Sequence, residues 1–402
     1  MSDFDVIIAG GGPGGLSAAQ AAAERGARVL VLEQGEEIGS PTRTTGGSFV
    51  KDLQLLGIPT HLYHPIHQCR FVSPNNEVVF RYKNPVTCVT DVRGLFQFLA
   101  VRAIEVGASI RLGTTAVEPI TDGDVVKGVR TKSTIYGDEV LTSSVLVDAT
   151  GYRASLLRKA GVSPGFKRFG VGSEFDLYAP DFDQSEAVLI VGTQIAPAGY
   201  AWAFPWGNGR VRLGVGIIHA DSDEHPDRYL KKLLGDASRF GMKLSKAQPL
   251  EYHYGLIPSD GLLEPLVGNG VLGVGDAAGQ ASALVGEGIR WAIKAGQMAG
   301  QIASEAVAAG DCSAKFLQRY QRQWKSTYGS NLHIAHEINK KMSQWDDAKW
   351  DAKTELLKHL SAEQFGEALQ ANFLAAWPFR LLLSHPSLIK EGFKEVRERL
   401  GI

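Results

Sequence analysis

The stretch that decides the fold lies at the start of the chain, where residues 4–33 read FDVIIAGGGPGGLSAAQAAAERGARVLVLE. An apolar run predicts a strand over Asp5–Ala9, and an alanine-rich segment predicts a helix over Gly14–Arg25. Gly26 ends this helix, and Arg28–Glu33 is expected to form a second strand. The glycine turn between the first strand and the helix is therefore the central feature of the unit.

This turn has the spacing Gly10-x-Gly12-x-x-Gly15. The first glycine permits a tight turn, the second lets the backbone approach a pyrophosphate, and the third lets the helix pack closely on the strand. The helix N-terminus then faces the phosphates. Glu33 follows about 20 residues on, where a carboxylate can bind an adenosine ribose hydroxyl. Because strands, helix and acidic residue all accompany the glycines, the unit predicts a dinucleotide site.

The bulk composition excludes several other classes of protein. The chain has 402 residues, which favours two or three domains, and its formal net charge of −1 gives no sign of nucleic-acid binding. Cys69, Cys88 and Cys312 are too far apart for a zinc or iron–sulfur motif, and we expect three reduced thiols. The N-terminus does not resemble a signal peptide, and no apolar run is long enough to span a membrane. We therefore expect a cytoplasmic protein.

Two later segments repeat the theme of an acidic residue at the end of a strand. Residues 145–156 read VLVDATGYRASL and place Asp148 after an apolar run. The strand predicted over Val271–Val274 leads into Gly275-Asp276, and Gly286-Glu287-Gly288 then opens a helix. A carboxylate at a strand end is well placed to bind sugar-like hydroxyls. The helix start offers free N–H groups to an anion or to the electron-rich edge of a ring.

A further helix is predicted over Asp91–Ala103, with Asp91 as its cap and Arg93 in its first turn. A cation in the first turn opposes the helix dipole, which indicates that it answers an anion. The alternative is an ordinary solvated arginine, and this segment alone leaves the two open.

Together, Gly10-x-Gly12-x-x-Gly15, Asp148-x-x-Gly151 and Gly275-Asp276-Ala277-Ala278 resemble the three fingerprints of FAD enzymes with the p-hydroxybenzoate-hydroxylase-like fold. The resemblance implies that Glu33 holds the adenosine ribose, Arg93 the pyrophosphate and ribityl region, and Asp276 the ribityl chain and pyrophosphate. It places Gly286–Ile289 at the pyrimidine end of the isoalloxazine. The full FAD site that it implies comprises Gly10, Gly12, Pro13, Gly14, Gly15, Glu33, Arg43, Thr44, Arg93, Asp148, Gly151, Gly275, Asp276, Gly286, Gly288 and Ile289.

A second match to the glycine pattern, Gly268-x-Gly270-x-x-Gly273, precedes a strand and opens no helix. We interpret it as a turn, so no second dinucleotide domain is expected. The reductant must then be a visitor, either NAD(P)H or an electron-donor protein.

The segment that narrows the function is residues 200–216, YAWAFPWGNGRVRLGVG, which predicts a β-hairpin with Tyr200, Trp202 and Phe204 on one face. Aromatic residues in strands usually belong to the core. The spacing of this segment, however, resembles the YxWxFPx8GxG signature of the geranylgeranyl reductase family. That resemblance implies an aromatic wall beside the flavin, suited to an extended polyprenyl chain, and reduction of its carbon–carbon double bonds.

Two rival functions stay open at this point. Flavin-dependent monooxygenases and halogenases share the fold, and the halogenases carry a related segment. A halogenase needs a lysine that holds the oxidised halide, and the candidates here are Lys51 and Lys294. The other rival is an isoprenoid- or quinone-binding flavoprotein that only passes electrons.

The expected architecture is an α/β fold, α+β overall, with a discontinuous Rossmann-type FAD-binding domain, an antiparallel β-sheet substrate domain and a C-terminal helical cap. The FAD domain is expected over residues 1–65, 92–165 and 262–310, and the substrate domain over 66–91 and 166–261. Residues 311–402 read as helical, with segments such as FLQRYQRQW, DAKTELLKHL and SLIKEGFKEVRERL. This tail is either a plain packed cap or one whose apolar face closes the lipid end of the cavity or touches a membrane surface.

Residues 37–47, EIGSPTRTTGG, resemble the IGxPxRC segment of archaeal-type geranylgeranyl reductases, where a cysteine lies near the isoalloxazine. Here Arg43 matches, but Thr44 stands in place of the cysteine and is followed by Thr45. A threonine hydroxyl can donate or accept a hydrogen bond but is far less acidic than a thiol. The catalytic candidates are therefore Thr44, Thr45, Tyr200, Trp202 and Phe204, with an apolar isoprenoid or lipid as the expected substrate.

Overall fold

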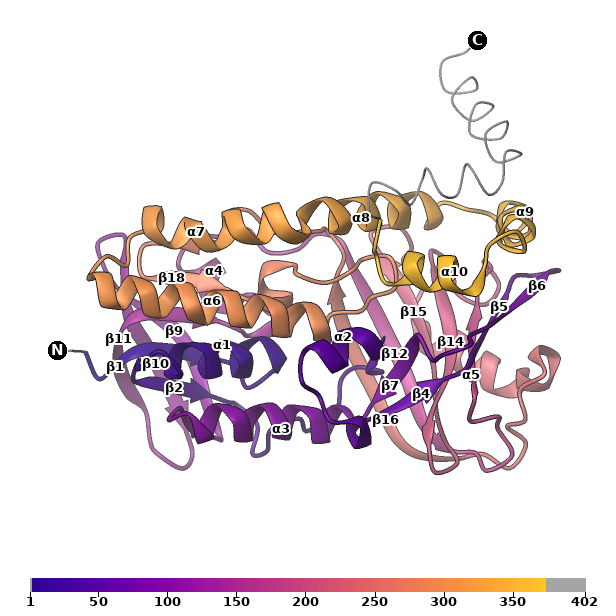
Figure 1. Ribbon diagram of the computed structural model, residues 1–402, viewed down its shortest axis with the longest axis horizontal. Coiled ribbons are helices and arrows are strands. Elements are labelled where there is room, and N and C mark those ends of the chain that lie inside the picture. Colours follow the sequence, from indigo (N-terminus) through magenta and orange to yellow (C-terminus); the bar gives the residue numbers. More distant parts are fainter. Residues whose placement is uncertain (1, 374–402) are drawn as a thin grey trace, which may run out of the picture.

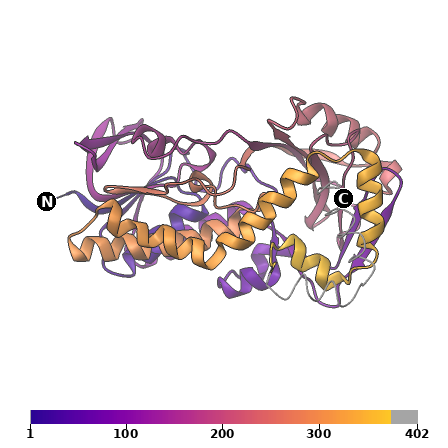
Figure 2. The same ribbon diagram turned by 90° about the horizontal axis from the view of Figure 1, so that it is seen from above.

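The computed structural model describes residues 2–373, which form two bodies side by side, each built on a β-sheet (Figure 1). Helices α7 (Ala314–Trp324) and α8 (Ser330–Met342) follow one another along one side of the molecule, from the first body to the second (Figures 1 and 2). The mixed α/β class is as expected.

The first body contains an eight-stranded sheet with a parallel centre. Its main order is β17-β18-β11-β1-β2-β8, and β10 pairs with both β11 and β9. β1 pairs in parallel with β2 and β11, and β11 in parallel with β18. The strands are β1 (Phe4–Ala9), β2 (Val29–Leu32), β8 (Ser109–Arg111), β9 (Thr114–Asp122), β10 (Val125–Ser133), β11 (Glu139–Asp148), β17 (Val267–Gly268) and β18 (Val271–Gly273).

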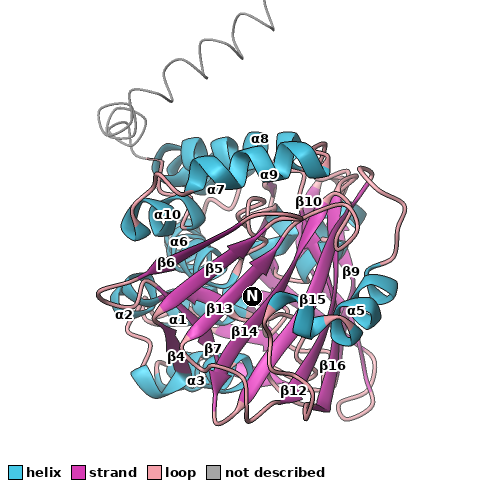
Figure 3. Ribbon diagram, turned by 90° about the vertical axis from the view of Figure 1, so that its right-hand side faces the viewer, coloured by secondary structure: helices cyan, strands magenta, loops and turns pink. Residues whose placement is uncertain are grey.

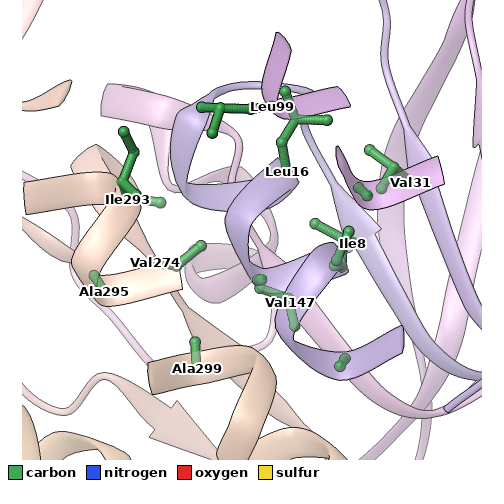
Figure 4. Close-up of a cluster of buried hydrophobic side chains, with 14 of the residues drawn as sticks. Ile8, Leu16, Val31, Leu99, Val147, Val274, Ile293, Ala295 and Ala299 are labelled. Atoms are coloured by element: carbon green, nitrogen blue, oxygen red, sulfur yellow. The ribbon is translucent and has the colours of Figure 1, made fainter. Parts of the chain in front are cut away.

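The core of this body packs on both faces of β1. Val6 and Ile8 join one buried cluster and Ile7 joins another, as expected for a central parallel strand covered on both sides. Figure 4 shows Ile8 among the buried side chains of α1 (Pro13–Ala23), α3 (Val92–Glu105) and α6 (Ile289–Ala309). The pattern of β1, α1 and β2 confirms the strand–helix–strand unit predicted from residues 4–33.

α1 and α6 approach very closely because both are rich in glycine and alanine. A Cβ atom at Gly296 would lie 2.2 Å from the carbonyl oxygen of Gly14, and one at Gly300 would lie 2.2 Å from that of Ala18. Neither position tolerates a side chain unless the helices move apart. This contact fixes the start of α6 relative to the glycine turn.

The second body contains a seven-stranded sheet, ordered β16-β12-β15-β14-β13-β5-β6 (Figure 3). The expected antiparallel pattern holds for every pair except β13 with β5, which run parallel. α5 (Pro226–Gly235) packs on one face of this sheet. The strands are β5 (Gln68–Val72), β6 (Glu77–Arg81), β12 (Phe169–Tyr178), β13 (Glu186–Ile190), β14 (Gly199–Gly207), β15 (Arg210–His219) and β16 (Gln248–Pro258).

A third, smaller sheet and several short elements complete the first part of the fold. A three-stranded sheet, ordered β3-β7-β4, contains β3 (Gly47–Phe49), β4 (Tyr63–Ile66) and β7 (Thr87–Thr90). Short helices are α2 (Val50–Leu55) and α4 (Ser155–Lys159). Four 3-10 turns complete the described chain, at Thr60–Leu62, Gly151–Arg153, Ala237–Phe240 and Gly275–Ala278.

Helices also form the end of the described chain, as predicted. A π-helical turn, Lys325–Gly329, joins α7 to α8, and α9 (Asp347–Leu357) and α10 (Ala362–Leu369) follow. Phe365 of α10 stacks on Phe80 of β6 with ring centroids 3.9 Å apart, so these last helices cover an edge of the second sheet. The helix predicted from SLIKEGFKEVRERL lies outside the described residues. No helix within residues 2–373 is long and apolar enough to cross a membrane.

Candidate functional site

The glycine turn between β1 and α1 leaves the helix N-terminus open. Gly10 has φ of +119°, and a Cβ there would lie 2.2 Å from the carbonyl oxygen of Ala149. A Cβ on Gly15 would lie 2.1 Å from the carbonyl oxygen of Gly10, whereas one on Gly12 would meet no atom within 4 Å. Gly12 caps α1 without a side-chain hydrogen bond, and Pro13 follows it. The free N–H groups and the open space fit a pyrophosphate.

Glu33 connects the end of β2 to this turn. Its carboxylate accepts hydrogen bonds from the backbone N–H of Gly11 at 2.7 Å and of Gly35 at 2.7 Å. A carboxylate has about four lone-pair positions, so acceptor capacity is left for the ribose hydroxyl expected there.

Asp148 is held by contacts with the protein itself, and its place in the FAD site stays a prediction. It is fully buried, and one carboxylate oxygen accepts from the backbone N–H groups of Leu156 and Leu157, both at 2.8 Å. The other accepts from the N–H and the hydroxyl of Thr150. Asp148 therefore holds the loop around Gly151 and the start of α4.

Asp276 is different, because its side chain has no hydrogen-bond partner within residues 2–373. Burial raises the pKa of its carboxyl to about 6. It lies beside the start of α6, where a Cβ on Gly288 would come within 3.2 Å of its Oδ1 atom. Buried polar groups are nearly always hydrogen-bonded. An unsatisfied carboxylate at this point fits the hydroxyl-bearing ribityl chain of FAD.

The two arginines expected near the cofactor lie in exposed positions. The Nε atom of Arg93 donates to Glu37 Oε1 at 2.5 Å, and the Arg93 side chain is 60% exposed. Arg43 is also exposed and makes no ion pair with any described residue. Arg93 thus forms an ion pair with a carboxylate of the neighbouring loop, and its binding of a phosphate stays a prediction.

The loop of residues 37–47 packs against the second sheet. A Cβ on Gly255 of β16 would lie 2.4 Å from the carbonyl oxygen of Arg43. A Cβ on Gly47 would lie 3.5 Å from the ring of Phe204. Thr44 is half-buried, and its hydroxyl makes no hydrogen bond within the described chain. The loop therefore lies between the glycine turn of the first body and the aromatic hairpin of the second.

The aromatic hairpin confirms the expectation that three rings share one face. Ring centroids of Tyr200 and Trp202 are 5.5 Å apart, and those of Trp202 and Phe204 are 6.5 Å apart. The Tyr200 hydroxyl donates to the carbonyl oxygen of Val285 at 2.6 Å. This bond ties the strip of rings to the loop that opens α6 at Gly286.

The two glycines of the hairpin signature have a physical role that the sequence did not reveal. They lie on β15 opposite the rings, with Gly214 paired to Trp202 and Gly216 paired to Tyr200. A Cβ on Gly214 would lie 2.3 Å from Cζ2 of Trp202, and one on Gly216 would lie 3.3 Å from its Cζ3. The Trp202 indole therefore lies flat against the backbone of Gly214 and Gly216, and we call these two residues the glycine bed.

Sequence reasoning missed a buried polar network beneath this indole. Glu174 of β12 accepts hydrogen bonds from Trp202 Nε1 at 2.7 Å and from the Thr45 hydroxyl at 2.5 Å. Its other carboxylate oxygen is 2.9 Å from Nδ1 of His253. The available signal was the pair of acidic residues, Glu174 and Asp176, in the strand of residues 169–178, but the pattern alone does not identify their partners.

A second buried cluster lies where α6 begins. Arg290 bonds to Glu287 at 2.7 Å, lies 3.3 Å from Asp52 Oδ2, and donates to the carbonyl oxygen of Gln370 at 2.5 Å. Lys294 pairs with Asp52 Oδ1 at 2.5 Å, while Lys51 is exposed on α2. Lys294 is thus occupied by a carboxylate, which does not suit a lysine that must hold an oxidised halide.

Two family models match consecutive parts of the chain. Residues 5–170 match the FAD dependent oxidoreductase family, and residues 171–257 match the geranylgeranyl reductase catalytic domain.

Full-length relatives carry one recurrent name. The chain is 31% identical over 395 residues to digeranylgeranylglycerophospholipid reductase 2 of Methanothermobacter thermautotrophicus, covering 96% of this chain and 98% of the relative. It is 30% identical to digeranylgeranylglycerophospholipid reductase of Methanocaldococcus jannaschii, covering 96% and 97%.

Solved structures show the same fold. A geranylgeranyl bacteriochlorophyll reductase-like protein of Thermoplasma acidophilum superimposes with a TM-score of 0.85 at 24% identity, over 96% of this chain and 98% of that chain. A myxobacterial chondrochloren halogenase, an FAD-dependent enzyme, gives a TM-score of 0.68 at 19% identity, over 93% and 91%.

Proposed function

Because this chain belongs to the geranylgeranyl reductase family of FAD-dependent oxidoreductases, we propose that it reduces carbon–carbon double bonds in a geranylgeranyl-type isoprenoid lipid. The single observation that carries the proposal is the meeting of three segments. The aromatic strip of β14, the loop of residues 37–47 and the start of α6 contact one another through Gly47 with Phe204 and Tyr200 with Val285. An apolar wall and a flavin-binding framework thus share one junction.

The residues proposed to hold FAD are those with open space around them or with hydrogen-bonding positions that the protein leaves unused. Gly12 offers the open helix N-terminus, Glu33 offers spare acceptor positions, and Asp276 offers an unsatisfied carboxylate. When bound, FAD supplies the hydride that reduces an alkene, which no protein side chain can supply. Asp148 holds the loop around Gly151 through hydrogen bonds to Thr150 and Leu156, and both residues are part of the proposed FAD site.

The aromatic strip suits the substrate for two reasons. A prenyl chain is apolar, so flat rings of Tyr200, Trp202 and Phe204 bury it without leaving polar groups unpaired. The alkene is also unactivated, and positive charge that develops on carbon is stabilised by an aromatic face. The glycine bed holds the Trp202 ring in a fixed position. A fixed apolar wall keeps water from the reacting bond.

The electron donor is a separate part of the proposal. The glycine pattern at residues 268–273 forms only the turn between β17 and β18, as predicted. We therefore propose that NAD(P)H or an electron-donor protein visits to reduce the flavin. Peripheral contact with a membrane would follow from a lipid substrate, and co-sedimentation with vesicles of isoprenoid phospholipid tests it.

The decisive experiment is anaerobic. The FAD-loaded protein, reduced with dithionite, is mixed with digeranylgeranyl phospholipid, and the lipid is analysed by mass spectrometry. We expect mass gains in steps of two hydrogens. An absence of any gain with polyprenyl lipids of several chain lengths would refute the proposal. Oxygen consumption with NAD(P)H and a flavin hydroperoxide spectrum would instead establish the monooxygenase class.

A further inference from the structure

A line of four polar side chains crosses the second sheet beneath the aromatic strip. Glu174 and His253 face each other in register on neighbouring strands β12 and β16. Their side chains are only 4% and 5% exposed. Buried ionisable groups are rare and costly unless they are paired. Asp176 and Arg212 are buried in the same sheet, but they pair with each other, so Glu174 and His253 need a reason of their own.

The contacts form one continuous chain of hydrogen bonds. From the inside outwards, the Thr45 hydroxyl lies 2.5 Å from Glu174 Oε2, and Glu174 Oε1 lies 2.9 Å from His253 Nδ1. His253 Nε2 then lies 3.0 Å from Glu251 Oε2. Every link is within the range of a strong hydrogen bond, and no gap separates neighbouring members.

The two ends of this chain lie in different environments. The Glu251 side chain is 54% exposed and reaches water. Thr45 is half-buried in the loop of residues 37–47, and that loop contacts the aromatic strip through Gly47 and Phe204. The chain therefore leads from bulk solvent to the junction at which the proposed site lies.

We propose that Glu251, His253, Glu174 and Thr45 form a proton relay for the double-bond reduction. The inference rests on the proposed function, because hydride addition to one alkene carbon must be completed by a proton on the other. Thr45 is the member that meets the reacting carbon. His253 and Glu174 act through Thr45, so they are positioning and relay residues rather than catalytic ones.

The step balances as follows. The alkene π bond breaks as hydride from the reduced flavin binds one carbon and the Thr45 hydroxyl proton binds the other. His253 Nδ1 gives its proton to Glu174 Oε1, and the Thr45 oxygen takes that proton from the carboxyl group once the group has rotated, so Glu174 returns to its carboxylate. His253 regains a proton at Nε2 from solvent through Glu251. The flavin is oxidised by two electrons, the alkene is reduced, and solvent loses one proton.

The charges around His253 favour its protonated, imidazolium form. Burial alone disfavours the imidazolium, but hydrogen bonds to Glu174 and Glu251 outweigh it and raise the pKa of His253. Arg212 of β15 works against this shift, and its own charge is answered by Asp176 of β12, 3.5 Å away. In the imidazolium both ring nitrogens donate, which satisfies both carboxylates at once.

The alternative is that Glu174 only positions Trp202, whose indole N–H it accepts at 2.7 Å. The two roles differ in their dependence on pH. A relay delivers its proton only while His253 is charged, so the rate of the proton-dependent step falls as pH rises through the pKa of His253. If Glu174 only positions the indole, the rate should show no such fall, or pH break, at the pKa of His253.

The test is a single turnover at a series of pH values. FAD-loaded enzyme is reduced with dithionite without oxygen and mixed with digeranylgeranyl phospholipid, and reoxidation of the flavin is followed by its absorbance. The variants are E174Q, H253Q and T45V, with T45S as the conservative variant that keeps the hydroxyl. FAD and lipid affinities are measured on each protein. The pKa of His253 is measured by NMR on the FAD-free wild type and E174Q.

We expect E174Q, H253Q and T45V to be slower by about 10²- to 10⁴-fold, the usual contribution of general acid catalysis. E174Q and H253Q should also lose the pH break, T45S should restore most of the rate, and the pKa of His253 should fall in E174Q. A wild type that reduces no prenyl lipid refutes the proposed function and the relay with it. If the wild type is active, the relay alone is refuted when E174Q keeps the pH break. It is also refuted when the slower rate of E174Q is fully explained by weaker binding of FAD or lipid.

Discussion

The glycine bed beneath Trp202 makes the sharpest prediction about stability. In Gly214→Ala the new Cβ would lie 2.3 Å from Cζ2 of the indole, whereas an ordinary contact needs at least 3.4 Å. The ring must therefore shift by the difference, about 1.1 Å. A shift directly away from Glu174 would lengthen the bond from Trp202 Nε1, now 2.7 Å, to about 3.8 Å, which is beyond hydrogen-bonding distance.

The expected cost combines two terms. Overpacking of a filled site costs about 1–3 kcal/mol. A lost hydrogen bond to a charged group adds about 1.5–3 kcal/mol. We expect Gly214→Ala to lower the free energy of unfolding by about 1–3 kcal/mol if the hydrogen bond survives the shift, and by about 2.5–6 kcal/mol if it is broken. Urea unfolding of the FAD-free protein, followed by circular dichroism, measures this difference.

Two matched variants test whether the loss of stability comes from the clash with the indole or from any side chain added to a glycine of this sheet. Gly172→Ala on β12 places its Cβ 3.9 Å from the same indole, an ordinary contact, and should change the free energy of unfolding by well under 1 kcal/mol. In a Trp202→Ala background the penalty of Gly214→Ala should largely vanish, as in a double-mutant cycle. If the penalty is equally large without the indole, the explanation of the signature glycines is wrong.

Three further predictions concern the cofactor and the threonine loop. Gly12→Ala should leave the melting temperature of the FAD-free protein unchanged, because its Cβ meets no atom within 4 Å, while FAD affinity measured by fluorescence quenching falls at least tenfold. Asp276→Asn should raise the stability of the FAD-free protein at neutral pH: the folded pKa of about 6 exceeds the unfolded value of 3.8, so stability is lost as pH rises between them. The same variant should weaken FAD binding, and unaltered stability above pH 6 would contradict the assignment. Thr44→Cys and Thr44→Ala should both alter turnover while FAD stays bound, and unchanged kinetics in both would remove Thr44 from the mechanism.

The first body could be predicted well because its information is local. The glycine spacing after a strand and before a helix has one main structural solution, and the structure has β1, α1 and β2 where residues 4–33 placed them. The hairpin of β14 and β15 was equally readable, since alternating apolar residues flank Asn208-Gly209 at the turn. The domain boundaries and the roles of the site residues stay predictions.

The parts that could not be predicted depend on partners far apart in sequence. Asp148 and Asp276 both lie at or just after the end of a strand and look alike in sequence. Asp148 accepts hydrogen bonds from protein N–H groups, whereas the Asp276 side chain has no hydrogen-bond partner among residues 2–373. Glu174 and His253 are 79 residues apart and meet only through strand pairing. Alternation in a strand indicates which side chains are buried, but not which of them are bonded.

The charge cluster at the start of α6 has a consequence for how the chain is made. Asp52 emerges early from the ribosome, Arg290 much later, and Gln370, which bonds to both, later still. Domains generally fold as they are synthesised, from the N-terminus onward. Until residue 370 is available, this pair lacks its last amide partner and a nascent chain carries incompletely satisfied charges. The synthesis of residue 370, rather than the folding of the first body, therefore completes this charge cluster.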